Sequence, residues 1–172
     1  GYLTGTGFSQ PLGIFTASAN GVPTTQDVST DNTSTSVTFD GLINAKHFMK
    51  AQYWPRARWV FHRDAVKQIR KLKDGEGQYL WQPAVGAGAG LPDRILDLPY
   101  DTSEYAPSTF TTGQYVGALA VWDMYWIADA LDLSVQVVDQ LYAESNQIGY
   151  IGRFESDGMP VLAEAFVRVK LG

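Results

Sequence analysis

Apolar side chains recur at helical spacing in two stretches of the first half of the chain. They lie three or four residues apart, and polar side chains fill most positions between them. This spacing predicts one helix over residues 40–53, just before Pro55, and a second helix after Asp64, which we expect to be its N-cap. The apolar positions are Leu42, Ala45 and Met49 in the first stretch and Val66, Ile69 and Leu72 in the second.

Runs of β-branched and aromatic residues fill much of the remaining sequence. Short runs of this kind, bounded by glycine, proline or polar residues, are typical of strands. Two helices combined with many strands predict an α+β fold in which helices flank a mixed sheet. We expect strands at residues 59–61, 79–81, 94–98, 115–122, 125–128 and 133–138.

The C-terminal stretch, residues 147–171, predicts two long strands that form a closing hairpin. We place the turn at Ser156, Asp157 and Gly158, because glycine tolerates the positive φ that a tight hairpin turn requires. Apolar and polar side chains alternate from Val161 to Leu171. This alternation indicates that the second strand has one buried face.

Two further segments show no sustained period. Residues 1–40 are rich in Gly, Thr, Ser and Asn, and residues 82–92 are rich in Gly and Pro. Neither has the Lys-Ser/Thr pair with which a phosphate-binding loop reaches phosphate and magnesium. We interpret both as extended or loop structure.

Charge is distributed unevenly along the chain. The net charge of the 172 residues is −5, but residues 46–73 carry +8 and the remainder carries −13. Ordinary solvated helix faces would explain the basic segment. The alternatives are a face that meets an acidic surface of a neighbouring copy, or non-specific contact with nucleic-acid phosphates. The residues of the candidate inter-subunit charge face are Lys46, Lys50, Lys67, Arg70 and Lys71.

Residue types that serve most enzymes and metal sites are scarce. The chain has no cysteine, and only His47 and His62 could supply an imidazole. Disulfides and thiolate chemistry are thereby excluded, and the two histidines lack the spacing of a zinc motif. We therefore expect a structural protein with no catalytic residue, cofactor or metal.

A small hydrolase is the distant alternative. Paired carboxylates can act as general acid and base, and chance pairs are common in a chain with 18 acidic residues. The candidate residues for such chemistry are Asp97, Asp101, Glu155, Asp157 and His62.

No membrane or secretory segment is visible in the sequence. The most apolar stretch, residues 115–131, contains Asp123 and Asp129, whose burial in lipid would be unfavourable. The first residues lack the basic and apolar regions of a signal peptide. We expect a soluble intracellular protein.

Short motifs follow one another along almost the whole chain. They are Thr4-Gly5-Thr6-Gly7 and Gln10-Pro11-Leu12-Gly13-Ile14 near the start, Trp59-Val60-Phe61-His62-Arg63, Leu72-Lys73-Asp74 and Gly77-Gln78-Tyr79-Leu80 in the middle, and Arg153-Phe154-Glu155-Ser156-Asp157-Gly158, Pro160-Val161 and Glu164-Ala165-Phe166 near the end. In this order and spacing they resemble the major capsid proteins of tailed phages with the Hong Kong ninety-seven type fold. No single motif is specific, but the series is.

The resemblance implies a division into domains. Residues 1–14 would be a connecting segment after a long spine helix. Residues 15–138 would form the axial domain, which surrounds the five-fold and six-fold axes of the capsomers. Residues 139–172 would be C-terminal strands of the peripheral domain. Family members also carry an N-terminal arm, an extended loop and the spine helix, so the resemblance implies that this chain is a C-terminal fragment.

The function that the resemblance implies is self-assembly into a shell. We expect a structural major capsid protein that forms pentamers and hexamers of an icosahedral phage or prophage head enclosing DNA. An encapsulin-like nanocompartment shell is the alternative. A loop facing the capsomer axis would contain Trp81, Gln82, Pro83, Gly86, Gly88 and Gly90.

The partners that we expect are copies of the chain itself. In the full-length protein a portal, a scaffold or a maturation protease would join them, packaged DNA would be contacted only non-specifically, and no membrane would be involved. The protein would lie in the virion capsid, and in the host cytoplasm before assembly.

Overall fold

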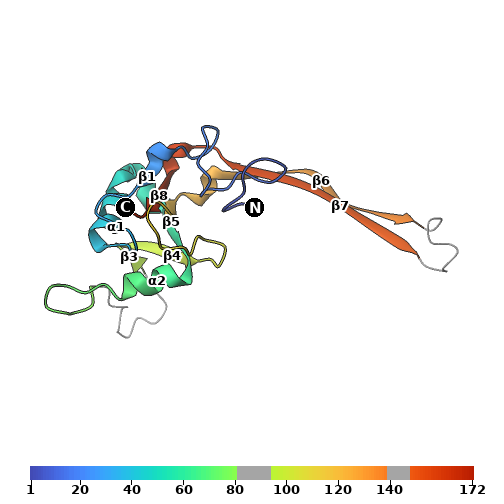
Figure 1. Ribbon diagram of the computed structural model, residues 1–172. Helices are drawn as coiled ribbons and strands as arrows, with labels where there is room; N and C mark the ends of the chain where they lie inside the picture. Colours follow the sequence, from blue (N-terminus) through green and yellow to red (C-terminus); the bar gives the residue numbers. More distant parts are fainter. Residues whose placement is uncertain (81–93, 139–147) are drawn as a thin grey trace, which may run out of the picture.

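A mixed β-sheet forms the body of the molecule, and a long two-stranded hairpin projects from it (Figure 1). The computed structural model describes residues 1–80, 94–138 and 148–172. The strands of the body sheet lie in the order β1-β8-β5-β2-β4-β3. Their bounds are β1 Asp27–Val28, β2 Arg58–Phe61, β3 Arg94–Ile95, β4 Leu98–Thr102, β5 Tyr115–Ala120 and β8 Phe166–Lys170.

Two α-helices bury their apolar stripes in the body. Helix α1 (Phe39–Phe48) packs against β8 and β1, and helix α2 (Arg63–Arg70) buries Ala65, Val66 and Ile69. Together with the sheet they give the α+β arrangement that the sequence predicts. Four 3₁₀ turns complete the described elements: η1 Thr24–Gln26, η2 Ala51–Arg56, η3 Trp122–Met124 and η5 Ala163–Ala165. Within the described ranges, no helix is long and apolar enough to cross a membrane.

Helix α1 is shorter than the predicted 40–53 helix. It begins after Thr38, whose hydroxyl accepts a hydrogen bond from the Gly41 amide at 3.0 Å. It ends at Phe48 because Met49 adopts an extended conformation, with φ −71° and ψ 133°. The indole of Trp54 donates to the carbonyl oxygens of Lys46 and Met49 at 3.2 and 3.1 Å. A side chain of the following 3₁₀ turn thus caps carbonyls that the helix leaves open.

Helix α2 has a different N-cap from the one that the sequence predicts. His62 holds that position, and its Nδ1 accepts a hydrogen bond from the Asp64 amide at 3.2 Å. Asp64 lies in the first turn instead, where its negative charge favours the positive end of the helix dipole. The predicted pattern of buried and exposed positions in this helix is confirmed.

Aromatic stacking inside the sheet defines the core. Trp59 and Phe61 stack with their ring centroids 5.5 Å apart, and both are fully buried. On the neighbouring strand β5, Gly117 pairs with Phe61, and the ring fills the space that a side chain would take. Glycine at this position therefore lets the aromatic ring lie flat on the sheet.

A buried ion pair joins the two ends of the chain. Arg168, on β8, is completely buried, and its Nε donates to Asp27 Oδ1 at 2.6 Å. Its two terminal nitrogens donate to the carbonyl oxygens of Ile14 at 3.3 Å and Pro23 at 2.8 Å. The Tyr115 hydroxyl donates to the other Asp27 oxygen at 3.0 Å, and the Tyr115 ring lies 4.8 Å from the guanidinium carbon. Every polar atom of this charge pair thus has a partner, which is what burial requires.

The predicted closing hairpin is wrong. Strand β7 (Gly149–Pro160) runs without a break through Ser156, Asp157 and Gly158 and pairs with β6 (Tyr125–Val138). Strand β8 belongs to the body sheet instead, between β1 and β5, and Phe166 to Val169 are buried on both faces rather than on one. The alternation of apolar and polar residues predicted one exposed face. Arg168 is nevertheless buried, because Asp27 neutralises its charge.

Four further strand predictions need correction. Residues 79–81 form no strand where they are described: Tyr79 makes only an isolated bridge to Lys73, and Trp81 lies outside the described residues. The predicted strand 94–98 is interrupted by a tight turn between β3 and β4, because Leu96 and Asp97 take positive φ values of 50° and 67°. The predicted strands 125–128 and 133–138 are parts of one strand, β6.

Removing one partner of the buried ion pair should destabilise the chain strongly. The substitution Asp27→Ala leaves the Arg168 charge buried without a counter-charge, so the free energy of unfolding should fall by about 3–5 kcal/mol. Asp101→Ala is the control, because the Arg58–Asp101 pair is about half exposed; its loss should be below about 1 kcal/mol. Urea denaturation measures both. An equal decrease in the free energy of unfolding for the two variants would contradict the assigned role of Arg168.

Adding a methyl group beside Phe61 should also destabilise the fold. A Cβ at position 117 would overlap Cδ1 and Cε1 of Phe61 and lie 2.8 Å from the Val60 carbonyl oxygen. Gly117→Ala should therefore lower the free energy of unfolding by about 1–3 kcal/mol. Gly75→Ala is the matched control, since nothing lies within 4 Å of its would-be Cβ. Thermal denaturation of both variants should separate them clearly.

Candidate self-assembly surfaces

One face of the projecting hairpin is apolar and exposed. In the pairing of β6 with β7, Val135 lies opposite Gly152 and Val137 opposite Tyr150, so these side chains share a face. Phe154 joins them, because alternate residues of a strand point the same way. The side chains of Val137, Tyr150 and Phe154 are 57%, 68% and 61% exposed. We call Val135, Val137, Tyr150 and Phe154 the apolar hairpin face.

The opposite face of the outer hairpin is mostly polar. Ser134 lies opposite Arg153, and Gln136 opposite Ile151, and all four are exposed. A two-stranded ribbon of this kind is marginally stable in water when nothing covers it. Contiguous exposed apolar patches on folded proteins mark surfaces that contact another protein, a membrane or a ligand. The apolar hairpin face therefore has the properties of a docking surface.

The base of the same hairpin is already covered by the N-terminal segment. The Leu12 amide donates to the Gly158 carbonyl at 2.8 Å, and the Tyr125 hydroxyl donates to the Leu12 carbonyl at 3.0 Å. The hydroxyls of Tyr2 and Ser156 lie 3.0 Å apart, and the Tyr2 ring meets the Tyr125 ring edge-on at 6.1 Å. The hairpin is thus fixed to the body at its base and uncovered farther out.

Burial at this base changes the acidity of one tyrosine. Loss of solvent around the phenol raises the pKa of Tyr125 to about 12, and Tyr2 and Asp157 add to the effect. The neutral phenol is the form that donates to the Leu12 carbonyl. The hydrogen bond that anchors the hairpin therefore depends on the proton that burial retains.

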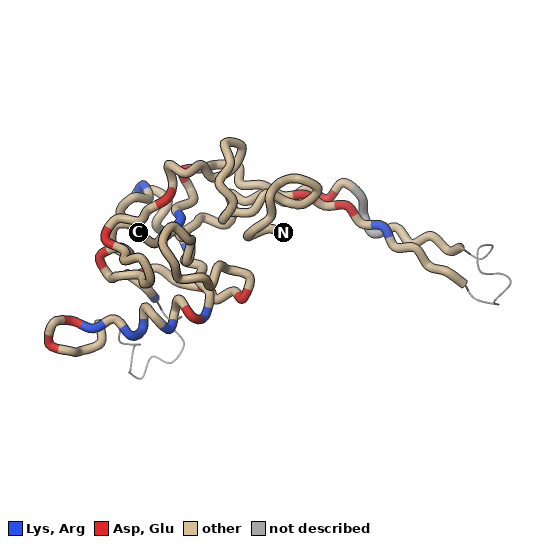
Figure 2. Tube along the Cα trace, in the orientation of Figure 1, with Lys and Arg blue, Asp and Glu red and all other residues tan. Residues whose placement is uncertain are grey.

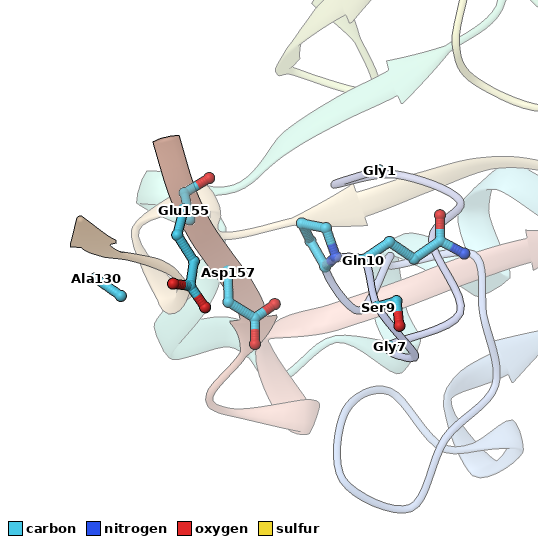
Figure 3. A pocket seen from close by; sticks show the side chains of 9 residues that line it. Gly1, Gly7, Ser9, Gln10, Ala130, Glu155 and Asp157 are labelled. Atoms are coloured by element: carbon cyan, nitrogen blue, oxygen red, sulfur yellow. The ribbon is translucent and has the colours of Figure 1, made fainter. Parts of the chain in front are cut away.

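A cavity of about 540 Å³ lies between the N-terminal segment and the hairpin (Figure 3). Glu155 and Asp157 extend from β7 along one wall, and Ser9 and Gln10 of the N-terminal loop lie across from them. Among the described residues, the lining contains two carboxylates but no histidine, lysine or arginine. The cavity is open to solvent. Its geometry is that of a groove between two segments.

The other candidates for catalysis are occupied by structural contacts. Asp101 accepts two hydrogen bonds from Arg58, at 2.7 and 2.8 Å. The Asp97 carboxylate lies 3.7 Å from Lys46 and is almost fully exposed. His62 caps α2, and its Nε2 lies 3.1 Å from the Glu104 carboxylate. In the parts of the chain that the structure describes, no group of three His, Asp or Glu side chains is placed to hold a metal ion.

The five residues of the candidate charge face do not share one environment. Lys46 is nearly buried, donates to the Leu96 carbonyl at 2.8 Å and lies over the Trp54 ring. Lys50 is paired with Glu164 at 2.7 Å, and hydrogen bonding to this carboxylate raises the pKa of the lysine. Both contacts are within the chain. We therefore separate these two lysines from the basic residues of α2.

Helix α2 and the residue after it present a basic stripe to solvent. Lys67, Arg70 and Lys71 are all exposed, and Figure 2 shows basic residues following one another along this helix. Arg70 donates to the Tyr100 hydroxyl at 3.0 Å. The side chains of Lys67 and Lys71 form no hydrogen bond or ion pair with the described residues. The predicted axis-facing loop, from Trp81 to Gly90, lies outside the described residues.

Comparison with known proteins gives a family. A long hairpin, exposed along its outer half, projects from an α+β body. The family model described as "Phage capsid family" matches residues 1–171, and the chain belongs to this family. The predicted relationship is confirmed, whereas neither the nanocompartment nor the hydrolase alternative receives support. No curated protein matches the chain.

Solved structures show the same fold. The capsid of an empty GTA particle, computed with C5 symmetry, has a TM-score of 0.78 and 22% sequence identity over 99% of this chain. The capsid of a native GTA particle gives the same TM-score and identity. A chain from Gordonia phage Cozz has a TM-score of 0.60 and 15% identity over 96% of this chain. The chain spans 60% of the empty GTA capsid chain and 53% of the Cozz chain.

Sequence reasoning missed two features that the structure reveals. The apolar hairpin face was missed because β6 was divided into two short strands; the alternation of Tyr150, Gly152 and Phe154 was the available signal. The ion pair was missed because its members lie 141 residues apart. A single arginine inside the apolar run of β8 was the available signal.

Alkaline pH should weaken the hairpin base through Tyr125. The folded chain keeps the phenolic proton to about pH 12, whereas an unfolded tyrosine loses it near pH 10. This stabilisation is complete below about pH 10 and is lost as pH rises toward 12. Tyr125→Phe removes that dependence, so the stability of the variant relative to wild type should increase across this window. Urea denaturation at several pH values measures it, and the exposed Tyr150→Phe variant is the control.

Proposed function

We propose that this chain is the C-terminal portion of a structural major capsid protein. The full-length protein assembles into pentamers and hexamers of an icosahedral phage or prophage head that encloses DNA. Membership of the phage capsid family supports this proposal, as does the C5 symmetry in the descriptions of the GTA capsids that share the fold. The observation that carries it is the apolar hairpin face, which a shell of packed layers would cover.

The division into domains follows the strand pairing in this proposal. Strands β6 and β7 pair only with each other among the described strands, so residues 125–160 are assigned to the peripheral domain. Strand β8 lies inside the body sheet, so the chain returns to the axial domain after residue 160. This boundary differs from the division at residues 138 and 139 that the sequence suggests.

In the assembled shell, chain outside residues 1–172, from the same copy or a neighbouring copy, would cover the apolar hairpin face. The N-terminal segment already covers the base of the hairpin, and the matched GTA capsid chain is longer than this one. Burial of Val137, Tyr150 and Phe154 would contribute about 1.5–3 kcal/mol for each fully buried side chain. Affinity in this assembly comes from apolar burial, and charged contacts fix the orientation of neighbours.

The remaining partners and the location follow from this function. Copies of the same chain are the main partners, and a portal, a scaffold or a maturation protease join them in the full-length context. Contact with packaged DNA is non-specific. The protein lies in the virion capsid, after a period in the host cytoplasm before assembly.

A charge placed on the apolar hairpin face should block assembly of the full-length protein. Val137→Asp puts a carboxylate where an apolar layer would pack, so closed shells should be reduced about tenfold or more, because burial of an unpaired charge is strongly unfavourable. Gln136→Asp is the matched control, since it lies next in the chain on the polar face. Negative-stain electron microscopy and sedimentation measure shell yield. The proposal fails if the wild-type protein forms no uniform closed shells.

A further inference from the structure

A small turn projects from the body immediately after α2. The Asp74 amide donates to the Gln78 carbonyl at 2.8 Å, and the Leu80 amide donates to the Leu72 carbonyl at 3.0 Å. The Asp74 carboxylate accepts hydrogen bonds from the amides of Glu76 and Gln78, at 3.0 and 2.8 Å. These contacts hold residues 73–79 in one conformation. We call these residues the projecting turn.

The projecting turn is held by its own contacts rather than by the body. Every residue from 73 to 80 is exposed, and Figure 1 shows the turn extending beyond α2. The Lys73 ammonium lies 4.9 Å from the centre of the Tyr79 ring, which links the two arms of the turn. Gly77, with φ 83°, takes the left-handed conformation that the reversal needs. A surface element that is ordered before it meets a partner loses less entropy on binding.

Opposite charges lie on the projecting turn and on α2. Glu76, in the turn, is exposed and forms no ion pair within the described residues. The same holds for Lys67 and Lys71 on the basic stripe. Figure 2 shows acidic residues in the turn and basic residues along α2, both at the same end of the body. The projecting turn and the basic stripe therefore carry opposite charges, and these charges do not pair with each other within one chain.

We propose that the projecting turn of one copy docks on the basic stripe of the next copy, with Glu76 facing Lys67 and Lys71. Each copy then offers a different element to each of its two neighbours. A contact of this kind closes into a ring when the rotation between copies adds up to a full turn without a shift along the axis. Both elements lie at one end of the body, so the ring axis runs beside that end. The charge contact sets the orientation of neighbours, and it recurs at every contact of the ring.

This inference rests on the proposed self-assembly, and a charge exchange in the full-length protein tests it separately. Glu76→Lys alone, and Lys67→Glu with Lys71→Glu, should each lower shell yield roughly tenfold, because a weak repulsion is repeated around the ring. The combined variant, with all three charges exchanged, should return to within about twofold of wild type. Sedimentation and electron microscopy measure yield. Glu76→Gln, which removes attraction without adding repulsion, should give a smaller loss than Glu76→Lys.

The outcomes separate this inference from the proposed function. If wild-type protein forms shells and the reversed variants form them equally well, the ring contact is wrong while the capsid function stands. If Glu76→Lys, the Lys67→Glu and Lys71→Glu variant, and the combined variant all fail to form shells, the proposed pairing is also wrong. Thermal denaturation must first show that each variant folds. Loss of packaged DNA from normal shells on reversal of Lys67 and Lys71 would assign the stripe to nucleic acid instead. Recovery of Glu76→Lys assembly at high salt would support the electrostatic cause.

Discussion

The buried pair of Arg168 and Asp27 determines how the two ends of this chain meet. Arg168 also binds the carbonyls of Ile14 and Pro23, so the segment before β1 is fixed to the last strand of the sheet. The residues that precede this segment then reach the base of the hairpin, where Leu12 contacts Gly158 and Tyr125. One buried charge therefore positions both the sheet edge and the origin of the projecting hairpin. Its desolvation is tolerated because every polar atom has a partner.

The hairpin shows the opposite situation, because none of the described residues outside it covers its outer half. The body buries aromatic and aliphatic side chains around Trp59 and Phe61, whereas Val137, Tyr150 and Phe154 remain in solvent. In the proposed shell this ribbon is one half of an interface, and apolar burial at that interface would supply the affinity for assembly.

Local patterns predicted the parts of the fold that depend on local interactions. The helix before Pro55, the basic helix after His62 and the buried strand containing Trp59 could all be read from spacing. Long-range pairing could not: β7 pairs with β6, and β8 enters the sheet beside β1, because turn residues such as Asp157 and Gly158 are also accommodated inside a regular strand. The basic face was predicted as one surface, but Lys46 and Lys50 are bound within the chain. Ordered sequence motifs indicated the family before any contact was visible, and the family match confirms it.

The central claim is that assembly covers the apolar hairpin face. Hydrogen exchange of backbone amides in β6 and β7 tests it most directly, with the isolated chain compared with assembled shells of the full-length protein. Amides of the outer hairpin, around Val137 and Tyr150, should exchange rapidly in the isolated chain and at least about a hundredfold more slowly in shells, because covering the ribbon suppresses its local opening. Equal exchange rates in the two states would contradict the account.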